Sequence, residues 1–107
     1  MRGEQKARPT IACRAPTEKE AETLGEIARK AGYEDFAKCK KDLWRADEYL
    51  ILLGRRVIGY AGLLVDTTGW WEELTPEIQV YMLDPQYQSY DRTVRRLLEK
   101  ELANGNW

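Results

Sequence analysis

A β-hairpin is the feature that most constrains how this chain can fold. Residues 49–53 are all apolar or aromatic, Gly54 and Arg55 follow them, and residues 56–65 form a second, mostly apolar run. Two strand-like runs separated by two residues, the first of them glycine, are typical of a tight antiparallel hairpin. The sequence therefore predicts a buried strand near 48–53 and its antiparallel partner at 56–65.

Two further strands are predicted on either side of this hairpin. Residues 10–14 form a short strand-like stretch that Ala15 and Pro16 close. Apolar and other residues alternate over 77–83, as expected of a strand, and Asp84 and Pro85 follow it as a stop signal.

Three helices are predicted from apolar spacing and capping signals. Thr17 and Glu20 form a capping box before a helix that Gly32 ends as the residue after the cap. A second helix is expected from Tyr33 to about Arg45, and a third from about Asp91 to Ala103. The expected fold is α/β (α+β): a mixed, mostly antiparallel sheet flanked by helices. It forms one domain, residues 10–107, after a flexible tail at 1–9.

Composition limits the kinds of partner. The chain has 107 residues, enough for one core, and its 17 basic residues are balanced by 18 acidic ones. No run of about 18 apolar residues and no signal-peptide pattern occurs. We therefore expect a cytoplasmic protein with no membrane partner and no nucleic-acid partner. Cys13 and Cys39 fit reduced thiols better than a disulfide or a metal site, so no metal is expected.

The absence of one residue type limits the chemistry. The chain contains no histidine, and Ser89 is its one serine. Serine–histidine triads, cysteine–histidine dyads and histidine-based zinc sites are therefore excluded. Any proton transfer must use a carboxylate, tyrosine, lysine, cysteine or water.

The order of these elements, with three sequence segments, resembles the GNAT superfamily of N-acetyltransferases. Residues 11–21 resemble the opening strand and first helix of the family, and residues 55–63 resemble its third strand. Residues 77–87 resemble the fourth strand and the proline-led turn after it. The resemblance covers roughly residues 10 to 102. It implies transfer of an acetyl group from acetyl-CoA to an amine whose identity the sequence does not give.

The resemblance also implies a set of site residues. Glu77 matches the general base of the family, although a solvated glutamate at a strand end is an equal alternative. Tyr81 and Leu83 match positions whose backbone amides meet the acetyl group and pantetheine. The loop that would hold the pyrophosphate is Gln88, Ser89, Tyr90, Asp91, Arg92 and Thr93.

This loop departs from the family pattern. Asp91 and Thr93 stand where the family has glycines, and a Cβ there hinders a close approach of backbone N–H groups to phosphate. The Asp91 carboxylate would also repel the pyrophosphate. We expect acetyl-CoA to bind weakly or not at all. Arg92, Arg95, Arg96 and Lys100 form a basic face that could bind phosphate instead, or be a solvated face paired with Glu99 and Glu101.

Two functional classes remain open at this stage. One is an N-acetyltransferase with Glu77 as base, and the other is a catalytically silent GNAT-like module that binds protein. Family members normally continue with a fifth strand, so we expect a truncated member or a second chain that completes the site. A homodimer or a protein partner is expected to cover the edge of residues 77–83, close to Trp70 or Trp71.

Overall fold

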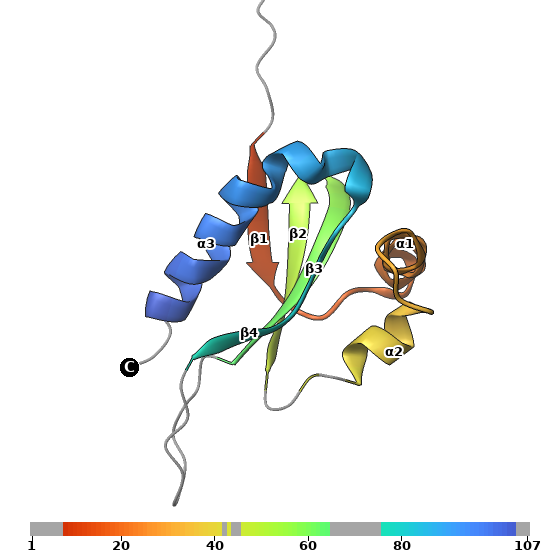
Figure 1. Ribbon diagram of the computed structural model, residues 1–107, viewed down its shortest axis with the longest axis horizontal. Coiled ribbons are helices and arrows are strands. Elements are labelled where there is room, and N and C mark those ends of the chain that lie inside the picture. The colour runs from red at the N-terminus through yellow and green to blue at the C-terminus, as the bar shows by residue number, and fades with distance from the viewer. Residues whose placement is uncertain (1–7, 42, 44–45, 65–75, 105–107) are drawn as a thin grey trace, which may run out of the picture.

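The structure is a computed structural model that describes residues 8–41, 43, 46–64 and 76–104. A four-stranded sheet lies between α1 and α2 on one side and α3 on the other (Figure 1). The elements in chain order are β1 (Pro9–Cys13), α1 (Glu18–Lys30), α2 (Phe36–Lys40), β2 (Asp47–Leu53), β3 (Arg56–Leu64), β4 (Glu77–Leu83), the 3₁₀ helix η1 (Pro85–Tyr90) and α3 (Asp91–Asn104). An α/β fold of the α+β kind is thus present.

The strands follow one another across the sheet in sequence order, β1-β2-β3-β4. All three pairs are antiparallel. The expected mixed sheet is therefore wrong for the described residues, which contain no parallel pair. The reason lies between β1 and β2: the chain passes through α1 and α2 and returns to the end where β1 finishes, so that Cys13 pairs with Tyr49.

The predicted hairpin is confirmed. Leu53 pairs with Arg56, and the two turn residues lie between them. Gly54 has a φ of 65°, the left-handed value that both primed turn types require at this position. Glycine adopts it without the cost that a Cβ would bring.

Two bulges interrupt the ladders. Ile58 is the extra residue of β3 opposite β2, and Gln79 is the extra residue of β4 opposite β3. A bulge reverses the alternation of side chains across a sheet. Ile78 therefore packs on the α3 side, whereas Val80 and Met82 pack on the α1 side, instead of all three sharing one face.

The core has two halves, one on each face of the sheet. On the α1 and α2 side it includes Leu24, Ile27, Phe36, Leu50, Tyr60 and Met82. On the α3 side it includes Tyr49, Ile51, Ile58, Leu63, Val94 and Leu98. The two inner strands, β2 and β3, carry apolar side chains on both faces.

Helix α1 has the predicted ends. The Thr17 backbone N–H donates to Glu20 Oε1 at 2.9 Å, and the Glu20 N–H donates to Thr17 Oγ1 at 3.2 Å, which completes the capping box. Gly32 has a φ of 102°, and the Tyr33 N–H donates to the Ala28 carbonyl at 2.8 Å. This is the glycine-based helix end that the sequence predicts.

Helix α2 is shorter than predicted. It starts at Phe36 because Tyr33 belongs to the closure of α1, and because the Asp35 carboxylate caps α2 by accepting from the Lys38 N–H at 2.8 Å. It ends at Lys40, after which the Leu43 N–H donates to the Lys40 carbonyl. The remaining predicted positions 42, 44 and 45 lie outside the described residues.

Some sequence expectations cannot be placed. The predicted tail 1–9 lies outside the described residues up to position 7, but Pro9 already belongs to β1. The segment 65–75, with Trp70 and Trp71, also lies outside them. In the part of the chain that the structure describes, no helix combines the length and apolar character needed to cross a bilayer.

Candidate functional site

The residues that the sequence nominates lie in two separate places. Leu83 ends β4, and residues 88–93 follow it through η1 into the start of α3, so these lie together at one end of the sheet. Glu77 starts β4 at the opposite end (Figure 1). Six steps along a strand span about 20 Å, so β4 separates the candidate base from the candidate phosphate loop.

The segment after β4 uses several of its backbone N–H groups in hydrogen bonds within the segment. The buried Asp84 caps η1, because its Oδ1 accepts from the Gln86 N–H at 3.0 Å and its carbonyl accepts from the Tyr87 N–H at 2.8 Å. The Asp91 N–H donates in turn to the Gln88 carbonyl. These three backbone donors are therefore satisfied within the chain and do not point toward a ligand. An anion cradle needs such N–H groups to be free.

The Asp91 side chain is held by two neighbours. The Tyr81 hydroxyl donates to Asp91 Oδ1 at 2.6 Å, and Arg95 Nε lies 3.2 Å from Oδ1 and 3.0 Å from Oδ2. The Arg95 guanidinium carbon lies 4.6 Å from the centre of the Tyr81 ring. Two of the nominated residues, Tyr81 and Asp91, are thus in direct contact.

This contact changes the charge argument made from the sequence. The Tyr81 hydrogen bond, followed by that of Arg95, lowers the pKa of Asp91 below its usual value. Burial, followed by the hydrogen bond to Asp91, raises the pKa of Tyr81, which stays a donor at neutral pH. Because Arg95 offsets the Asp91 charge, the repulsion of phosphate is weaker than the sequence alone suggested.

The basic face of α3 is mostly unpaired. Arg95 pairs with Asp91, whereas Arg92, Arg96 and Lys100 are exposed and have no ion pair within the described residues. The pairing of this face with Glu99 or Glu101 that the sequence suggested does not occur in this part of the chain. Thr93, Gln88 and Ser89 are exposed and Tyr90 is half-buried.

Glu77 is exposed and pairs in register with Leu64 at the start of β4. Its position suits a base that a substrate could reach, and equally a solvated glutamate at a strand end. Tyr81 and Leu83 face α3 with their side chains and pair with Ala61 and Gly59 of β3.

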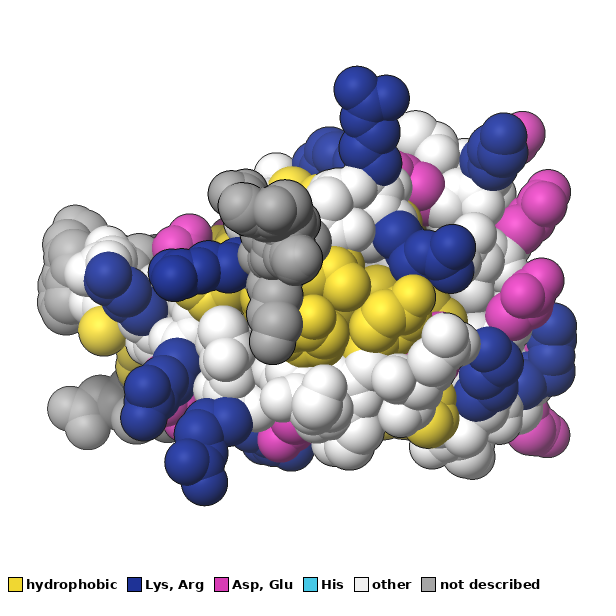
Figure 2. Space-filling view, turned by 90° about the horizontal axis from the view of Figure 1, so that it is seen from above, with side chains coloured by type: hydrophobic (Ala, Val, Ile, Leu, Met, Phe, Trp, Pro, Cys, Tyr) yellow, Lys and Arg dark blue, Asp and Glu magenta, His cyan; other side chains and the backbone are white. Residues whose placement is uncertain are grey.

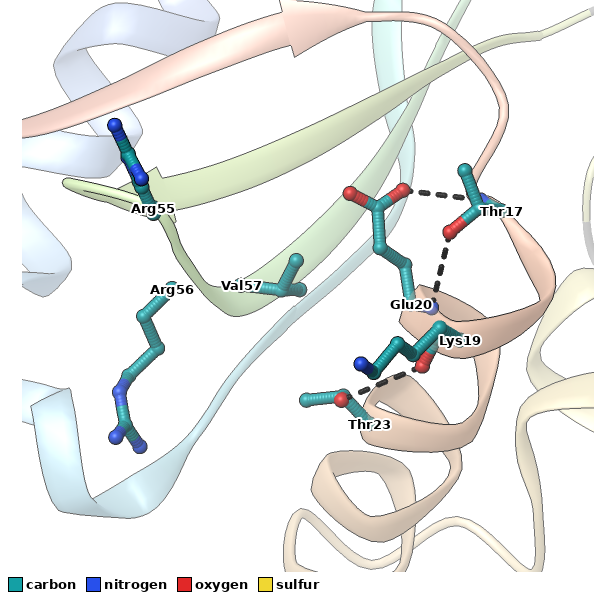
Figure 3. A pocket seen from close by; sticks show the side chains of 7 residues that line it. All are labelled: Thr17, Lys19, Glu20, Thr23, Arg55, Arg56 and Val57. Atoms are coloured by element: carbon teal, nitrogen blue, oxygen red, sulfur yellow. Dashed lines mark hydrogen bonds between the residues drawn. The ribbon is translucent and has the colours of Figure 1, made fainter.

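A surface groove that the sequence did not indicate lies between the start of α1 and the β2–β3 turn (Figure 3). It has a volume of about 560 Å³ and is lined by Thr17, Lys19, Glu20, Thr23, Arg55, Arg56 and Val57. Its two walls are more than thirty positions apart in sequence, so no local motif could have revealed it. That Lys19, Arg55 and Arg56 line one groove could therefore be seen only once the structure was known.

Comparison of the chain with protein-family models, curated proteins and solved structures gave no match. The GNAT resemblance thus rests on the residues quoted above and on the order of elements. Among the described residues, no group of three or more cysteine, aspartate or glutamate side chains is arranged to hold a metal ion.

Proposed function

We propose that this chain is a GNAT-like domain that binds protein through the edge of β4 that faces away from β3 and does not hold acetyl-CoA as the family does. One observation carries the proposal. Within the described residues β4 has a single hydrogen-bonded neighbour, β3, and Glu77 is its one charged residue. An edge strand whose one charge lies at its first residue is a ready template for an added strand.

The two edges of the sheet differ in the features that prevent such pairing. β1 begins with Pro9, which has no N–H to donate, and is flanked by Arg8 and Arg14. β4 has one protective feature, the bulge at Gln79. Beyond this bulge β4 continues without charge to Leu83, so β4 is the better docking edge.

The closed segment after β4 supports the loss of cofactor binding. Acetyl-CoA would need backbone N–H groups of residues 88–93, and among these the Asp91 N–H is already occupied by the Gln88 carbonyl. Freeing this N–H would cost a hydrogen bond of about 1 kcal/mol before the cofactor gained any.

A second copy of the chain can supply the added strand. Antiparallel pairing of two β4 strands centred on Val80 would place Glu77 of each copy beside Leu83 of the other. The carboxylates of the two strands would then lie at opposite ends and would not repel. Such a contact is self-complementary, as two-fold symmetry requires.

Ile78→Lys is expected to weaken this association by about tenfold or more, because a lysine on an edge strand opposes strand addition. Ile11→Lys is the matched control. Both isoleucines are half-buried on edge strands and pack against the same half of the core. Sedimentation velocity over a range of protein concentrations measures the effect.

The control should associate as the unmodified protein does. Equal weakening by both lysines would indicate lost folding stability in place of a lost contact. An unmodified protein that stays monomeric at millimolar concentration would contradict pairing through β4.

Acetyl transfer is the second candidate function, and the exposure of Glu77 at the start of β4 favours it. If the protein transfers acetyl groups to any amine of a broad panel, Glu77→Gln should lower the rate about 10²- to 10⁴-fold, because amide cannot accept the ammonium proton. The loss should shrink at alkaline pH, where amines deprotonate unaided. Transfer that is unchanged in Glu77→Gln would remove Glu77 from this role.

A further inference from the structure

The groove between α1 and the β2–β3 turn has an excess of positive charge. Lys19 comes from the first turn of α1, and Arg55 and Arg56 come from the turn and the first residue of β3. The end of the molecule that carries this turn shows many Lys and Arg side chains around a hydrophobic patch (Figure 2). Three cations line the groove against one carboxylate, that of Glu20.

That one carboxylate is already neutralised from outside the groove lining. Arg14 contacts both Glu20 oxygens, with distances of 2.7 Å to Oε1 and 2.9 Å to Oε2. The Arg14 hydrogen bonds, helped by the Thr17 N–H, lower the pKa of Glu20 to about 2. In the described part of the chain, Glu20 pairs with Arg14 and forms no ion pair with the lysine or the arginines of the groove.

The three cations themselves have no partner of their own. In the part of the chain that the structure describes, no ion pair or hydrogen bond is made by the side chains of Lys19, Arg55 or Arg56, and the hydrogen bond from the Thr23 hydroxyl reaches only the Lys19 backbone carbonyl. Figure 3 shows Arg55 and Arg56 extending in opposite directions from the turn, so their exposed side chains must swing toward the groove to hold one anion. Like charges brought together repel, and an anion with more than one charge stabilises them. Arginine also presents paired N–H donors that match phosphate oxygens.

Two further features suit a small ligand. The Thr17 Oγ1 accepts from a helix N–H, which leaves its own O–H free to donate. Val57 is nearly buried and gives the groove an apolar wall. The groove volume of about 560 Å³ is in the range of small-molecule sites. The whole chain has a formal charge of −1, which does not favour binding of a long polyanion such as a nucleic acid.

We propose that this groove binds a small soluble ligand that carries a diphosphate or a comparable pair of phosphate charges, held by Lys19, Arg55 and Arg56. The site is separate from the β4 edge, and it borders the segment after β4 at Val57, which precedes Ile58, whose carbonyl accepts from the Asp84 N–H at 2.7 Å. It therefore does not depend on the function proposed above.

The test is a titration of ¹⁵N-labelled protein with inorganic pyrophosphate, followed by amide chemical shifts. Saturable shifts are expected at Lys19, Thr23 and residues 55–57. The shifts at Arg92 and Arg96 on α3 should be small. Orthophosphate, with fewer charges, should bind about tenfold more weakly.

Two double variants that remove the same amount of positive charge distinguish binding at the groove from non-specific attraction of pyrophosphate to the whole protein. Arg55→Gln with Arg56→Gln should weaken pyrophosphate binding about tenfold or more. Arg92→Gln with Arg96→Gln, on the exposed face of α3, should change it less than about twofold. All four arginines are exposed, so both variants are expected to fold, which their circular dichroism verifies.

Three results would overturn the proposal. The first is that both double variants weaken pyrophosphate binding equally. The second is that the saturable shifts are centred on α3. The third is that pyrophosphate shows no saturable binding up to about 10 mM, a concentration that would saturate a specific site. A fourth result would contradict the proposal that the ligand is small and soluble: binding to vesicles that carry phosphorylated inositol headgroups, without binding of free pyrophosphate.

Discussion

Gly59→Ala is expected to lower the free energy of unfolding by about 3 kcal/mol, because the added methyl group has no space between β3 and β4. A Cβ at this position would lie 2.5 Å from the Met82 carbonyl oxygen and 3.3 Å from Leu83 Cα. Both are backbone atoms of the neighbouring strand and cannot rotate away. Relief requires β3 and β4 to separate where Gly59 pairs with Leu83. Denaturant unfolding measures the loss.

Gly62→Ala is the matched control on the same strand. A Cβ there would lie 2.1 Å from Leu43 Cδ2, which is the far end of a side chain that can change rotamer. The expected loss is only about 1 kcal/mol. Equal losses for the two variants, or a Gly59→Ala protein as stable as the unmodified one, would show that β3 and β4 are not packed as described.

Asp91→Asn is expected to lower the free energy of unfolding by about 2 kcal/mol at neutral pH. It weakens a charge-assisted hydrogen bond from the Tyr81 hydroxyl and removes the ion pair with Arg95. It also removes a negative charge from the first turn of α3, where the helix dipole favours one. Glu99→Gln makes the same charge change on an exposed face of α3 and should cost less than about 0.5 kcal/mol.

A double-mutant cycle with Tyr81→Phe isolates the contact itself. Tyr81→Phe alone should cost about 1 kcal/mol, and the double variant should cost less than the sum by about 1 kcal/mol. Additive losses would show that Tyr81 and Asp91 do not interact.

The same contact predicts a pH dependence. The folded protein lowers the pKa of Asp91, so its contribution to stability is present above the unfolded value of about 4. That contribution is lost as the pH falls through the lower folded pKa. The difference in stability between the unmodified protein and Asp91→Asn should therefore shrink below about pH 4. A difference that stays constant to pH 2 would contradict the assignment.

Local signals in the sequence predicted the local structure well. The hairpin follows from Gly54 between two apolar runs, and the ends of α1 follow from the Thr17–Glu20 pair and from Gly32. In each case the residues that determine the structure lie within a few positions of one another. Such short-range chemistry can be derived without the fold.

Features that depend on contacts across the sheet could not be derived. The bulge at Gln79 is set by the register of β4 against β3, and it moves Ile78 to the opposite face from Val80. The sequence also presented Asp91 as a charge beside a phosphate site. Its partner Tyr81 lies on another element, so the engagement of its carboxylate became visible only in the structure.

Calorimetric titration of the unmodified protein with acetyl-CoA tests the central claim most directly. In the loop 88–93 the Asp91 N–H is taken by the Gln88 carbonyl, and just before this loop the Gln86 and Tyr87 N–H groups are taken by Asp84. We expect no saturable heat that depends on residues 88–93, and any weaker binding through the diphosphate of acetyl-CoA should be lost with Arg55→Gln and Arg56→Gln, at a dissociation constant weaker than about 1 mM. A dissociation constant of about 10 µM or tighter, lost when residues 88–93 are altered, would contradict the claim and restore the cofactor site of an acetyltransferase.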